Sequence, residues 1–325
     1  MSALWLCATA ASSEPVEKGV ALGLFASDAD YDYGPMLDEI KALGATHVQL
    51  DVVWMQRTQQ SVRIHRYPGV TPSDAAVLRT LRQAKERGLA ATLFPIVRLE
   101  QHTRAQWRGT LAPAAGVDAW FSSYRDFLVL MADLARRGEA AQLSVGSEFV
   151  SLEGEVFKWR VLIDEVRTHF AGDLLYSANW DHFAEVPFWD RLDEAGVTAY
   201  FELAHDDALP SERSLDEAWA APRASLAAMR ERVHKRLIVT EVGYPSLVGA
   251  AHKPWDETAV AAVDLEGQAR LLGAFCRAFR PATDKSVAVD GFYVWNWFGS
   301  GAADGSYSPR GKPAARAVAA CMRSW

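Results

Sequence analysis

Two apolar, strand-like runs in this sequence of 325 residues each carry a glutamate near their end. QLSVGSEF (residues 142–149) delivers Glu148, and RLIVTEVGY (residues 236–244) delivers Glu241. Burying a carboxylate at a strand end costs several kcal/mol unless the group is paired or used. Two such carboxylates facing each other suit glycoside hydrolysis, in which one acid protonates the leaving oxygen and one carboxylate attacks the anomeric carbon.

The elements that must position these glutamates are apolar strand-like runs alternating with amphipathic helical patterns, which predicts an α/β fold, a single (β/α)8 barrel. The predicted strands are residues 20–27, 46–54, 89–97, 141–149, 174–180, 196–203, 236–244 and 289–297. The predicted helices are residues 33–44, 73–88, 124–138, 156–170, 214–233 with a break at Pro222, 265–279, and a last helix from near Lys312. A doubly wound sheet is the alternative, but FASDADYDYG after the first strand lacks the glycine-rich phosphate turn that such a sheet needs.

No linker or composition shift divides the chain, so we expect one catalytic domain over residues 19–325. Residues 1–18 are expected to be a partial signal peptide or a disordered N-terminus, since Ala8-Thr9-Ala10 resembles a cleavage site but no basic segment precedes it. We therefore expect a secreted or periplasmic protein, with a cytoplasmic one as the alternative. No later run approaches the ~20 apolar residues of a membrane-spanning helix.

In a (β/α)8 barrel the C-terminal ends of the strands meet at the face that holds the active site. Glu148 closes the fourth predicted strand and Glu241 the seventh, so their carboxyl groups can face each other across the barrel. A separation of about 5–5.5 Å would suit a covalent glycosyl intermediate. The other residues at the predicted strand ends are Trp54, Arg98, Asn179, Trp180, Tyr200 and Trp295 to Trp297.

Other chemistries find less support. The net charge of −7 argues against nucleic acid as a partner. No metal or cofactor is expected, because CxxC and HExxH motifs are missing and the histidines are scattered. DADYDYGPMLDE (28–39) has acidic residues at calcium-loop offsets, but Tyr33 stands where the loop needs glycine, which favours helix-capping aspartates.

Cys276 and Cys321 could pair if their helices are neighbours, and the sequence leaves this open. We expect a monomer.

Several segments resemble glycoside hydrolase family 113, a family of retaining β-mannanases in clan A. The most specific are GSEF (146–149), SANWD (177–181) and TEVGY (240–244), and all the similar segments fall in order between residues 120 and 314. The resemblance implies a retaining hydrolase of a β-linked polysaccharide or oligosaccharide, with β-mannan as the first guess. It implies that Glu148 is the acid/base and Glu241 the nucleophile.

The resemblance also assigns roles around the two glutamates. Tyr200 would hydrogen-bond Glu241, Asn179 and Trp180 would line subsites, and Trp297 would form the floor beneath the reacting sugar. Ser147 departs from the pattern, because many clan A enzymes have at this position an asparagine that binds the sugar 2-hydroxyl. The identity of the sugar at the reacting position is therefore left open.

For two other residues at the strand ends the sequence leaves alternatives open. Arg98 could bind substrate hydroxyls, keep Glu241 ionised or form a salt bridge at the rim. Trp54 could be a subsite or packing at the barrel mouth, since tryptophan serves both purposes.

Two other classes of function compete with the glycosidase. A carbohydrate-binding barrel without turnover, serving polysaccharide capture or assembly, would need aromatic platforms but not the paired acids. An aldolase-like or isomerase barrel would need a lysine at a strand end or a phosphate loop after the seventh and eighth strands. Neither of those features is evident in the sequence.

Overall fold

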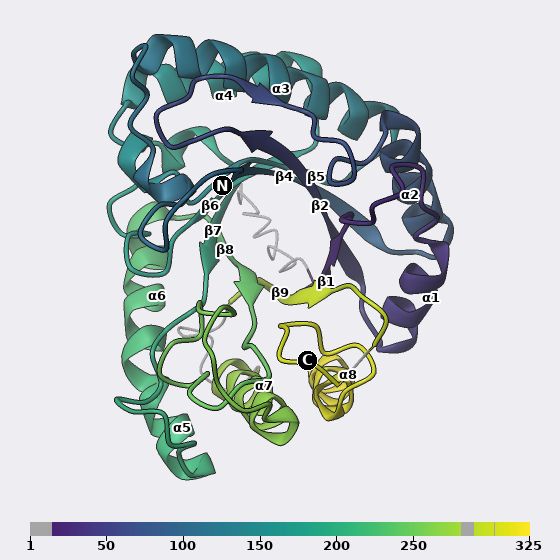
Figure 1. Cartoon of the computed structure of the whole chain (residues 1–325), viewed down its shortest axis with the longest axis vertical. Coiled ribbons are helices and arrows are strands. Elements are labelled where there is room, and N and C mark those ends of the chain that lie inside the picture. The colour runs from purple at the N-terminus through teal and green to yellow at the C-terminus, as the bar shows by residue number, and fades with distance from the viewer. Residues whose placement is uncertain (1–14, 281–288, 302) are drawn as a thin grey trace, which may run out of the picture.

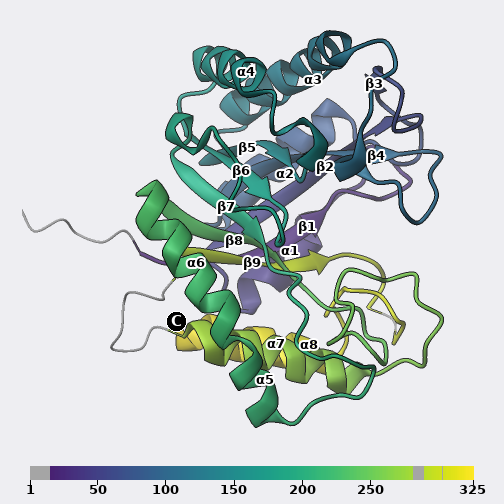
Figure 2. The ribbon, with the colours of Figure 1, turned by 90° about the vertical axis from the view of Figure 1, so that its left-hand side faces the viewer.

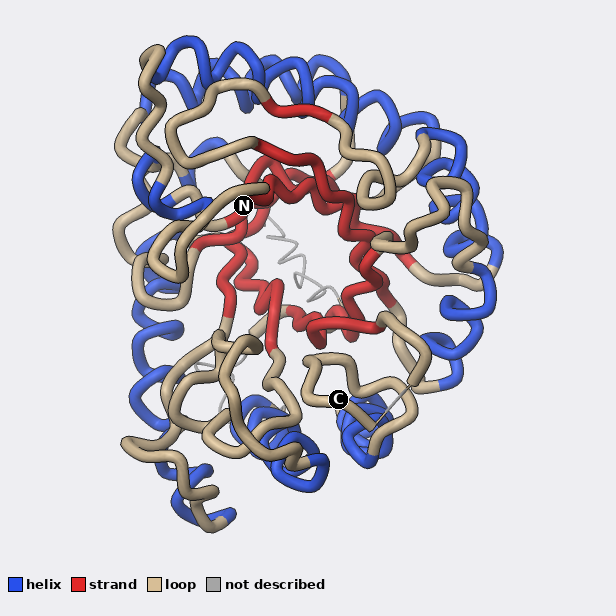
Figure 3. Tube along the Cα trace, in the orientation of Figure 1, coloured by secondary structure: helices blue, strands red, loops and turns tan. Residues whose placement is uncertain are grey.

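The computed structural model describes residues 15–280, 289–301 and 303–325. Eight parallel strands form a closed ring with helices around it (Figures 1 and 3), which confirms the predicted (β/α)8 barrel. The ring closes where β1 pairs with both β2 and β9. The barrel strands are β1 Glu17–Gly23, β2 His47–Gln56, β4 Ala90–Leu99, β5 Gln142–Ser147, β6 Asp173–Ala178, β7 Glu194–Thr198, β8 Arg236–Val242 and β9 Gly291–Trp297; β3, Ile64–His65, pairs antiparallel to β2.

Helices lie outside the strand ring and supply the outer layer of the fold (Figure 2). None of the helices in the described ranges is long and apolar enough to cross a membrane. The α-helices are α1 Gly34–Ala42, α2 Asp74–Glu86, α3 Val117–Arg137, α4 Val156–His169, α5 Glu212–Ala218, α6 Ala220–Val233, α7 Leu265–Phe279 and α8 Pro313–Ser324; the 3₁₀ helices are η1 Arg108–Thr110, η2 Val150–Leu152 and η3 Trp189–Arg191.

Several boundaries differ from the sequence prediction, and the largest shift is the start of α3, at Val117 rather than at residue 124. The barrel begins at Glu17 rather than at residue 19, because Glu17 is the buried first residue of β1. The helical segment 214–233 breaks at Trp219, between α5 and α6, rather than at Pro222. Pro222 lies in the first turn of α6, where its missing N–H removes no helical hydrogen bond. Most of the expected signal segment, residues 1–14, lies outside the described residues.

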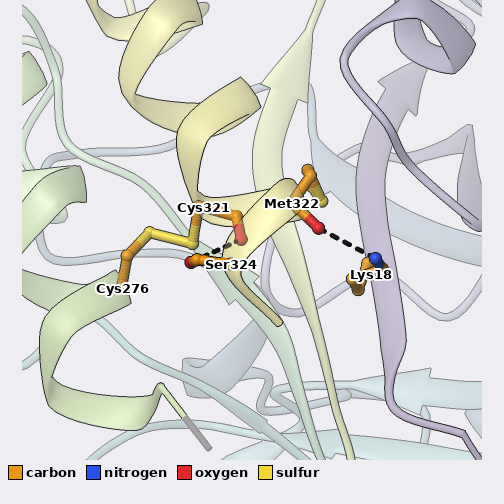
Figure 4. The surroundings of a disulfide bond; sticks show 5 residues. All are labelled: Lys18, Cys276, Cys321, Met322 and Ser324. Atoms are coloured by element: carbon orange, nitrogen blue, oxygen red, sulfur yellow. Dashed lines mark hydrogen bonds between the residues drawn. A yellow bond between two sulfur atoms is a disulfide. The ribbon is translucent and has the colours of Figure 1, made fainter.

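A disulfide joins Cys276 on α7 to Cys321 on α8, with a sulfur–sulfur distance of 2.01 Å (Figure 4). The two helices are neighbours. The sequence could not decide whether they would be, and the pairing of the two cysteines depended on it. Close by, Nζ of Lys18 on β1 donates to the carbonyl of Met322 at 2.8 Å. The C-terminal helix is thus tied to α7 covalently and to the first strand by a hydrogen bond.

The apolar core has two layers. The large layer lies between strands and helices, and a smaller cluster of Val53, Phe94, Ile96 and Leu175 comes from β2, β4 and β6. Val53 and Ile96 also line the cavity described below, so this cluster forms part of the cavity wall. A rigid support of this kind matters because side chains that perform chemistry must be held in place by packing.

Candidate active site

A cavity of about 820 Å³ lies at the C-terminal ends of the barrel strands. Both glutamates singled out from the sequence, Glu148 and Glu241, line it. This is the face on which active sites of (β/α)8 barrels lie. Of the other predicted site residues, Arg98, Asn179, Trp180 and Tyr200 also line the cavity.

Glu148 follows the last residue of β5 and is held by contacts on both carboxylate oxygens. Its backbone has a φ of 55°, in the left-handed region that non-glycine residues rarely adopt and that is concentrated at functional sites. Thr198 Oγ1 donates to Oε1 at 2.9 Å, and Arg108 Nη2 donates to Oε2 at 2.5 Å. The two contacts hold the carboxyl group of Glu148 in one orientation at the cavity.

The segment that carries Glu148 is anchored from behind by aromatic packing. Phe149, the next residue, is buried among aromatic rings of α3 and α4, including Trp120 and Trp159. Its backbone N–H donates to the Tyr176 hydroxyl of β6 at 2.8 Å. The turn that aims Glu148 into the cavity is therefore fixed by both packing and hydrogen bonding.

Glu241 lies in β8 and is 2% exposed. Tyr200 donates its hydroxyl to Oε2 at 2.8 Å, as the family resemblance implies, whereas Oε1 is buried and has no hydrogen-bond partner among the described residues. Burial, and secondly the negative charge of Glu148, raise the pKa of Glu241 to about 8, although Arg108 and Tyr200 oppose the shift. Burial and the neighbouring negative charge thus favour the protonated form of Glu241 near neutral pH.

Tyr200 lies just beyond β7, which ends at Thr198. Burial and the charge of Glu241 raise the pKa of its phenol well above the ordinary value. Tyr200 therefore stays a neutral O–H donor and can keep Oε2 of Glu241 in one orientation. Its ring packs edge-on against Tyr307, with 5.9 Å between ring centroids.

Trp180 forms part of an aromatic surface at the cavity. Its ring stacks on Trp255 with centroids 5.3 Å apart and planes 14° from parallel, and Trp255 is 43% exposed. Trp255 belongs to the loop between β8 and α7 and was not singled out from the sequence, because nothing in AHKPWDET separates an exposed tryptophan from a buried one. Beside Trp180, Asn179 donates to Asp181 at 2.5 Å, and both residues line the cavity.

Trp297, predicted as the floor beneath the reacting sugar, does not line the cavity. It is buried, and its Nε1 donates to Glu39 of α1 at 2.8 Å. Trp295, two residues earlier on β9, lines the cavity instead. The pairing of β9 with β1 shifts register opposite this stretch, so regular side-chain alternation does not extend to the strand end.

Two further predicted residues also lie away from the cavity lining. Ser147 is buried, and its hydroxyl has no partner among the described residues. Trp54 packs on Phe127, with centroids 4.8 Å apart, and the Arg66 guanidinium lies 4.8 Å from its ring centre. For Trp54 the structure thus favours packing, which was one of the two readings left open.

Arg108 is another site residue that sequence reasoning missed. It lies on η1, in the loop between β4 and α3, ten residues beyond the strand end occupied by Arg98. The sequence search considered only the ends of strands. It could not identify a residue that lies at the cavity because a long loop folds back towards it. Thr198, the second partner of Glu148, is the last residue of β7. The sequence prediction extended this strand to residue 203, so Thr198 was not recognised as a strand end.

No group of three or more histidine, cysteine or acidic side chains in the described part of the chain is arranged to hold a metal ion. The acidic residues of the calcium-like segment have other partners. Asp32 accepts the backbone N–H of Gly34 at the start of α1, and Asp28 accepts that of Asp30. Glu39 forms an ion pair with Arg310 at 2.6 Å.

Comparisons with known proteins agree with this geometry. The model of Glycoside Hydrolase Family 113 matches residues 26–306. The family 113 β-mannanase AaManA from Alicyclobacillus acidocaldarius is similar in structure, with a TM-score of 0.81 and 27% identity over 95% of this chain and 97% of that chain. A family 113 β-1,4-mannanase has a TM-score of 0.84 and 23% identity over 96% of this chain and 100% of that chain.

A more distant structure, the GH5_18 protein from Streptomyces cattleya, shares the fold with a TM-score of 0.63 and 17% identity, over 96% of this chain and 80% of that chain. No curated protein matches the chain in sequence. The family model spans most of the chain and includes both glutamates of the cavity, Glu148 and Glu241. The protein therefore belongs to glycoside hydrolase family 113 and is a glycoside hydrolase.

Proposed function

We propose that the protein is a retaining hydrolase of β-1,4-linked mannan or manno-oligosaccharides. The observation that carries the mechanism is the pair Glu148 and Glu241, buried together at one cavity with Tyr200 bonded to only one oxygen of Glu241. The similarity to AaManA, described as a β-mannanase, supports the choice of sugar. A carbohydrate-binding barrel without turnover would need the aromatic surface but not the coupled acids.

In the first step Oε1 of Glu241, the oxygen without a partner, attacks the anomeric carbon. The C–O bond to the leaving sugar breaks, and Glu148 gives its proton to the departing oxygen. The attack requires Glu241 as a carboxylate, whereas its raised pKa favours the protonated form near neutral pH. Glu241 must therefore be ionised before the attack, and Glu148 must carry the proton that the leaving oxygen receives.

In the second step water attacks the glycosyl ester and Glu148 takes the proton from it. Glu148 acts as base in this step, with Arg108 as the hydrogen-bond donor beside it. The product carries the same anomeric configuration as the substrate, because each of the two displacements inverts it.

The stereochemical course tests this proposal. Proton NMR of the first product from a β-1,4-linked manno-oligosaccharide should show the β-anomer before mutarotation. A Glu148→Ala variant given an aryl β-mannoside with a good leaving group and sodium azide should yield the β-glycosyl azide. An α-anomer in the first minutes would exclude Glu241 as nucleophile. Binding of the oligosaccharide without any hydrolysis would favour the non-catalytic barrel.

We also propose that the protein is exported to the periplasm or the exterior of the cell. The disulfide between Cys276 and Cys321 supports export, because disulfides persist mainly in oxidising compartments. Thiol labelling of the protein isolated from its native cells, with and without prior reduction, tests this. Free thiols at both positions would contradict export.

A further inference from the structure

A third buried glutamate follows Glu148 in the chain and has no part in the mechanism above. Glu153 comes directly after the 3₁₀ helix η2 and is 3% exposed. Burial raises the pKa of its carboxyl group to about 7, although a hydrogen bond from Tyr176 opposes the shift. Burying a carboxyl group costs free energy unless the group is paired or used, so the position of Glu153 requires a reason.

Glu153 does not line the cavity, so it does not touch a substrate there. Its Oε1 accepts the hydroxyl of Tyr176 at 2.7 Å, and its Oε2 is buried with no hydrogen-bond partner among the described residues. Within the described part of the chain, Tyr176 is the one side chain that donates to Glu153. An influence of the Glu153 side chain on the cavity therefore passes through Tyr176.

The hydroxyl of Tyr176 connects Glu153 to the turn that carries Glu148. It accepts the backbone N–H of Phe149 at 2.8 Å while it donates to Glu153. A hydroxyl has one proton, so an acceptor at Glu153 fixes where that proton points and leaves a lone pair for Phe149. The N–H of Phe149, the hydroxyl of Tyr176 and the carboxyl group of Glu153 thus form one buried chain of hydrogen bonds, in which each bond strengthens the next.

The turn needs such support because its backbone is strained. Glu148 has a φ of 55°, a conformation that persists in residues other than glycine only when the surroundings enforce it. The pairing of β5 with β6 is irregular here, with a register shift between Ser144 and Ser147. The N–H of Glu148 still donates to the carbonyl of Ser177 on β6, at 2.8 Å. The next N–H, that of Phe149, has a side chain as its acceptor instead of the neighbouring strand.

Packing fixes the ring of Tyr176, so its hydroxyl stays at the turn. The ring is fully buried and lies edge-on to Trp159, Phe188 and Trp189, with centroids 5.5, 5.2 and 6.2 Å away. Gly146 on β5 leaves room for it, because a Cβ there would lie 2.9 Å from the ring. A ring held in this way transmits the position of its hydrogen bonds to the turn.

We propose that Glu153 is a positioning residue for the acid/base: through the hydroxyl of Tyr176 it fixes the N–H of Phe149, and with it the carboxyl group of Glu148 beside the leaving oxygen. The inference rests on the proposed function, which gives Glu148 its part in the departure of the leaving sugar. An acid must lie within hydrogen-bond reach of the oxygen that it protonates. Interrupting the chain should therefore impair proton transfer and spare the attack by Glu241.

Two aryl β-manno-oligosaccharides with the same sugar chain separate proton transfer from the attack. A phenyl glycoside needs a proton on its leaving oxygen, whereas a dinitrophenyl glycoside releases a stable phenolate without one. The ratio of kcat/KM for the dinitrophenyl substrate to that for the phenyl substrate therefore measures how well Glu148 delivers its proton. A purely structural defect lowers both values together and leaves this ratio unchanged.

Tyr176→Phe and Glu153→Leu each interrupt the chain and should raise the ratio about tenfold or more, because a positioned acid contributes about 10²–10⁴-fold to the rate. Glu153→Gln keeps an acceptor oxygen for Tyr176 and should stay within about twofold of the wild-type ratio. Tyr124→Phe is the matched control. Its buried hydroxyl donates to the carbonyl of Val145 on the same strand at 2.8 Å, and its ring packs on Phe149, but it is no part of the chain. It should leave the ratio unchanged.

Circular dichroism and thermal unfolding identify the variants that retain the fold, and Tyr176→Phe alone decides if Glu153→Leu does not fold. The wild-type ratio in either of these variants, once folded, would overturn the inference and leave the proposed function intact. A control that raises the ratio as much as they do would also overturn it. Wild-type protein that hydrolyses neither glycoside, or a Glu148→Ala variant with the wild-type ratio, would instead refute the proposed function, and the inference with it.

Discussion

The barrel contains two buried clusters of a glutamate pair with an arginine, one at each end. The first cluster, which we propose to be catalytic and call the catalytic cluster, is Glu148, Glu241 and Arg108 at the cavity. The basal cluster comprises Glu17, Glu194 and Arg236, which are the first residues of β1, β7 and β8. Both burials are costly, and both raise a glutamate pKa, to about 8 for Glu241 and to about 9 for Glu194.

The clusters differ in how completely their oxygens are satisfied. Arg236 bonds Glu17 at 2.9 Å and Glu194 at 2.7 Å. Gln142 donates to both glutamates at 2.9 Å, and the Tyr293 hydroxyl donates to Glu17 at 2.9 Å. In the catalytic cluster one oxygen of Glu241 has no partner among the described residues.

The comparison teaches that paired carboxylates alone do not mark an active site. Neighbouring side chains donate hydrogen bonds to both glutamates of the basal pair, which joins strands at the N-terminal end of the barrel. We therefore assign this pair a role in stability. The catalytic pair opens on a cavity and keeps one oxygen free, so it can react. The predictions below test this division, from the largest expected effect to the smallest.

Neutralising one glutamate in each cluster should separate the two roles most strongly. Glu241→Gln should lower kcat by about 10³-fold or more, since an amide cannot form the glycosyl ester. Glu194→Gln, the matched change in the basal cluster, should leave kcat within about twofold of wild type. Steady-state kinetics with circular dichroism checks both. Comparable losses of kcat in the folded Glu241→Gln and Glu194→Gln variants would contradict the assignment of different roles to the two clusters.

The disulfide should affect stability alone. Replacing Cys276 and Cys321 together by serine should lower the free energy of unfolding by about 2–4 kcal/mol, since the cross-link spans 45 residues. Activity at low temperature should not change, because neither residue lines the cavity. Urea unfolding and kcat measured on the same preparation decide this. A large fall in kcat at full folding would show that α7 and α8 position the site.

The basal cluster should make stability depend on pH. The pKa of Glu194 is raised from 4.5 to about 9, first by burial and next by the charge of Glu17. The stabilisation is therefore complete below about pH 4.5 and is lost as the pH rises towards 9, because the folded state holds a proton that the unfolded state has released. The free energy of unfolding of Glu194→Gln relative to wild type should rise over this range, by at most about 1.4 kcal/mol per pH unit.

Urea unfolding between pH 5 and pH 9 measures this difference. Glu241→Gln is the control from the catalytic cluster, and it should show the same sign over a range that ends near pH 8. If wild type and Glu194→Gln keep a constant difference over the whole range, the basal proton does not exist.

The smallest effect concerns the aromatic surface. Trp255→Ala should raise the Kd for an oligosaccharide by about tenfold or less, since a stacked, half-exposed ring contributes about 0.5–1.5 kcal/mol. Trp297→Phe should leave binding unchanged, because Trp297 bonds Glu39 away from the cavity. Calorimetric titration in the Glu241→Gln background compares the two. Weaker binding by Trp297→Phe with full affinity in Trp255→Ala would reverse the two assignments.

The sequence by itself was sufficient for the architecture and for the central pair. Alternating apolar runs and amphipathic helices predict eight strands in order, and the rule that barrel strands end at the active face brings Glu148, Glu241 and Tyr200 together. These inferences succeed because hydrophobic periodicity is local, and because a closed parallel barrel permits only one arrangement of its strand ends.

Only the tertiary structure decided which tryptophan faces the cavity, whether Cys276 and Cys321 pair, and where Arg108 lies. A register shift redirects side chains at the end of β9, the disulfide depends on the approach of α7 and α8, and Arg108 returns to Glu148 on a loop with no periodic pattern. Contacts between segments far apart in the chain depend on how the whole fold closes. Local sequence therefore specified the carboxylates, and the closure of the fold specified their charged and aromatic neighbours.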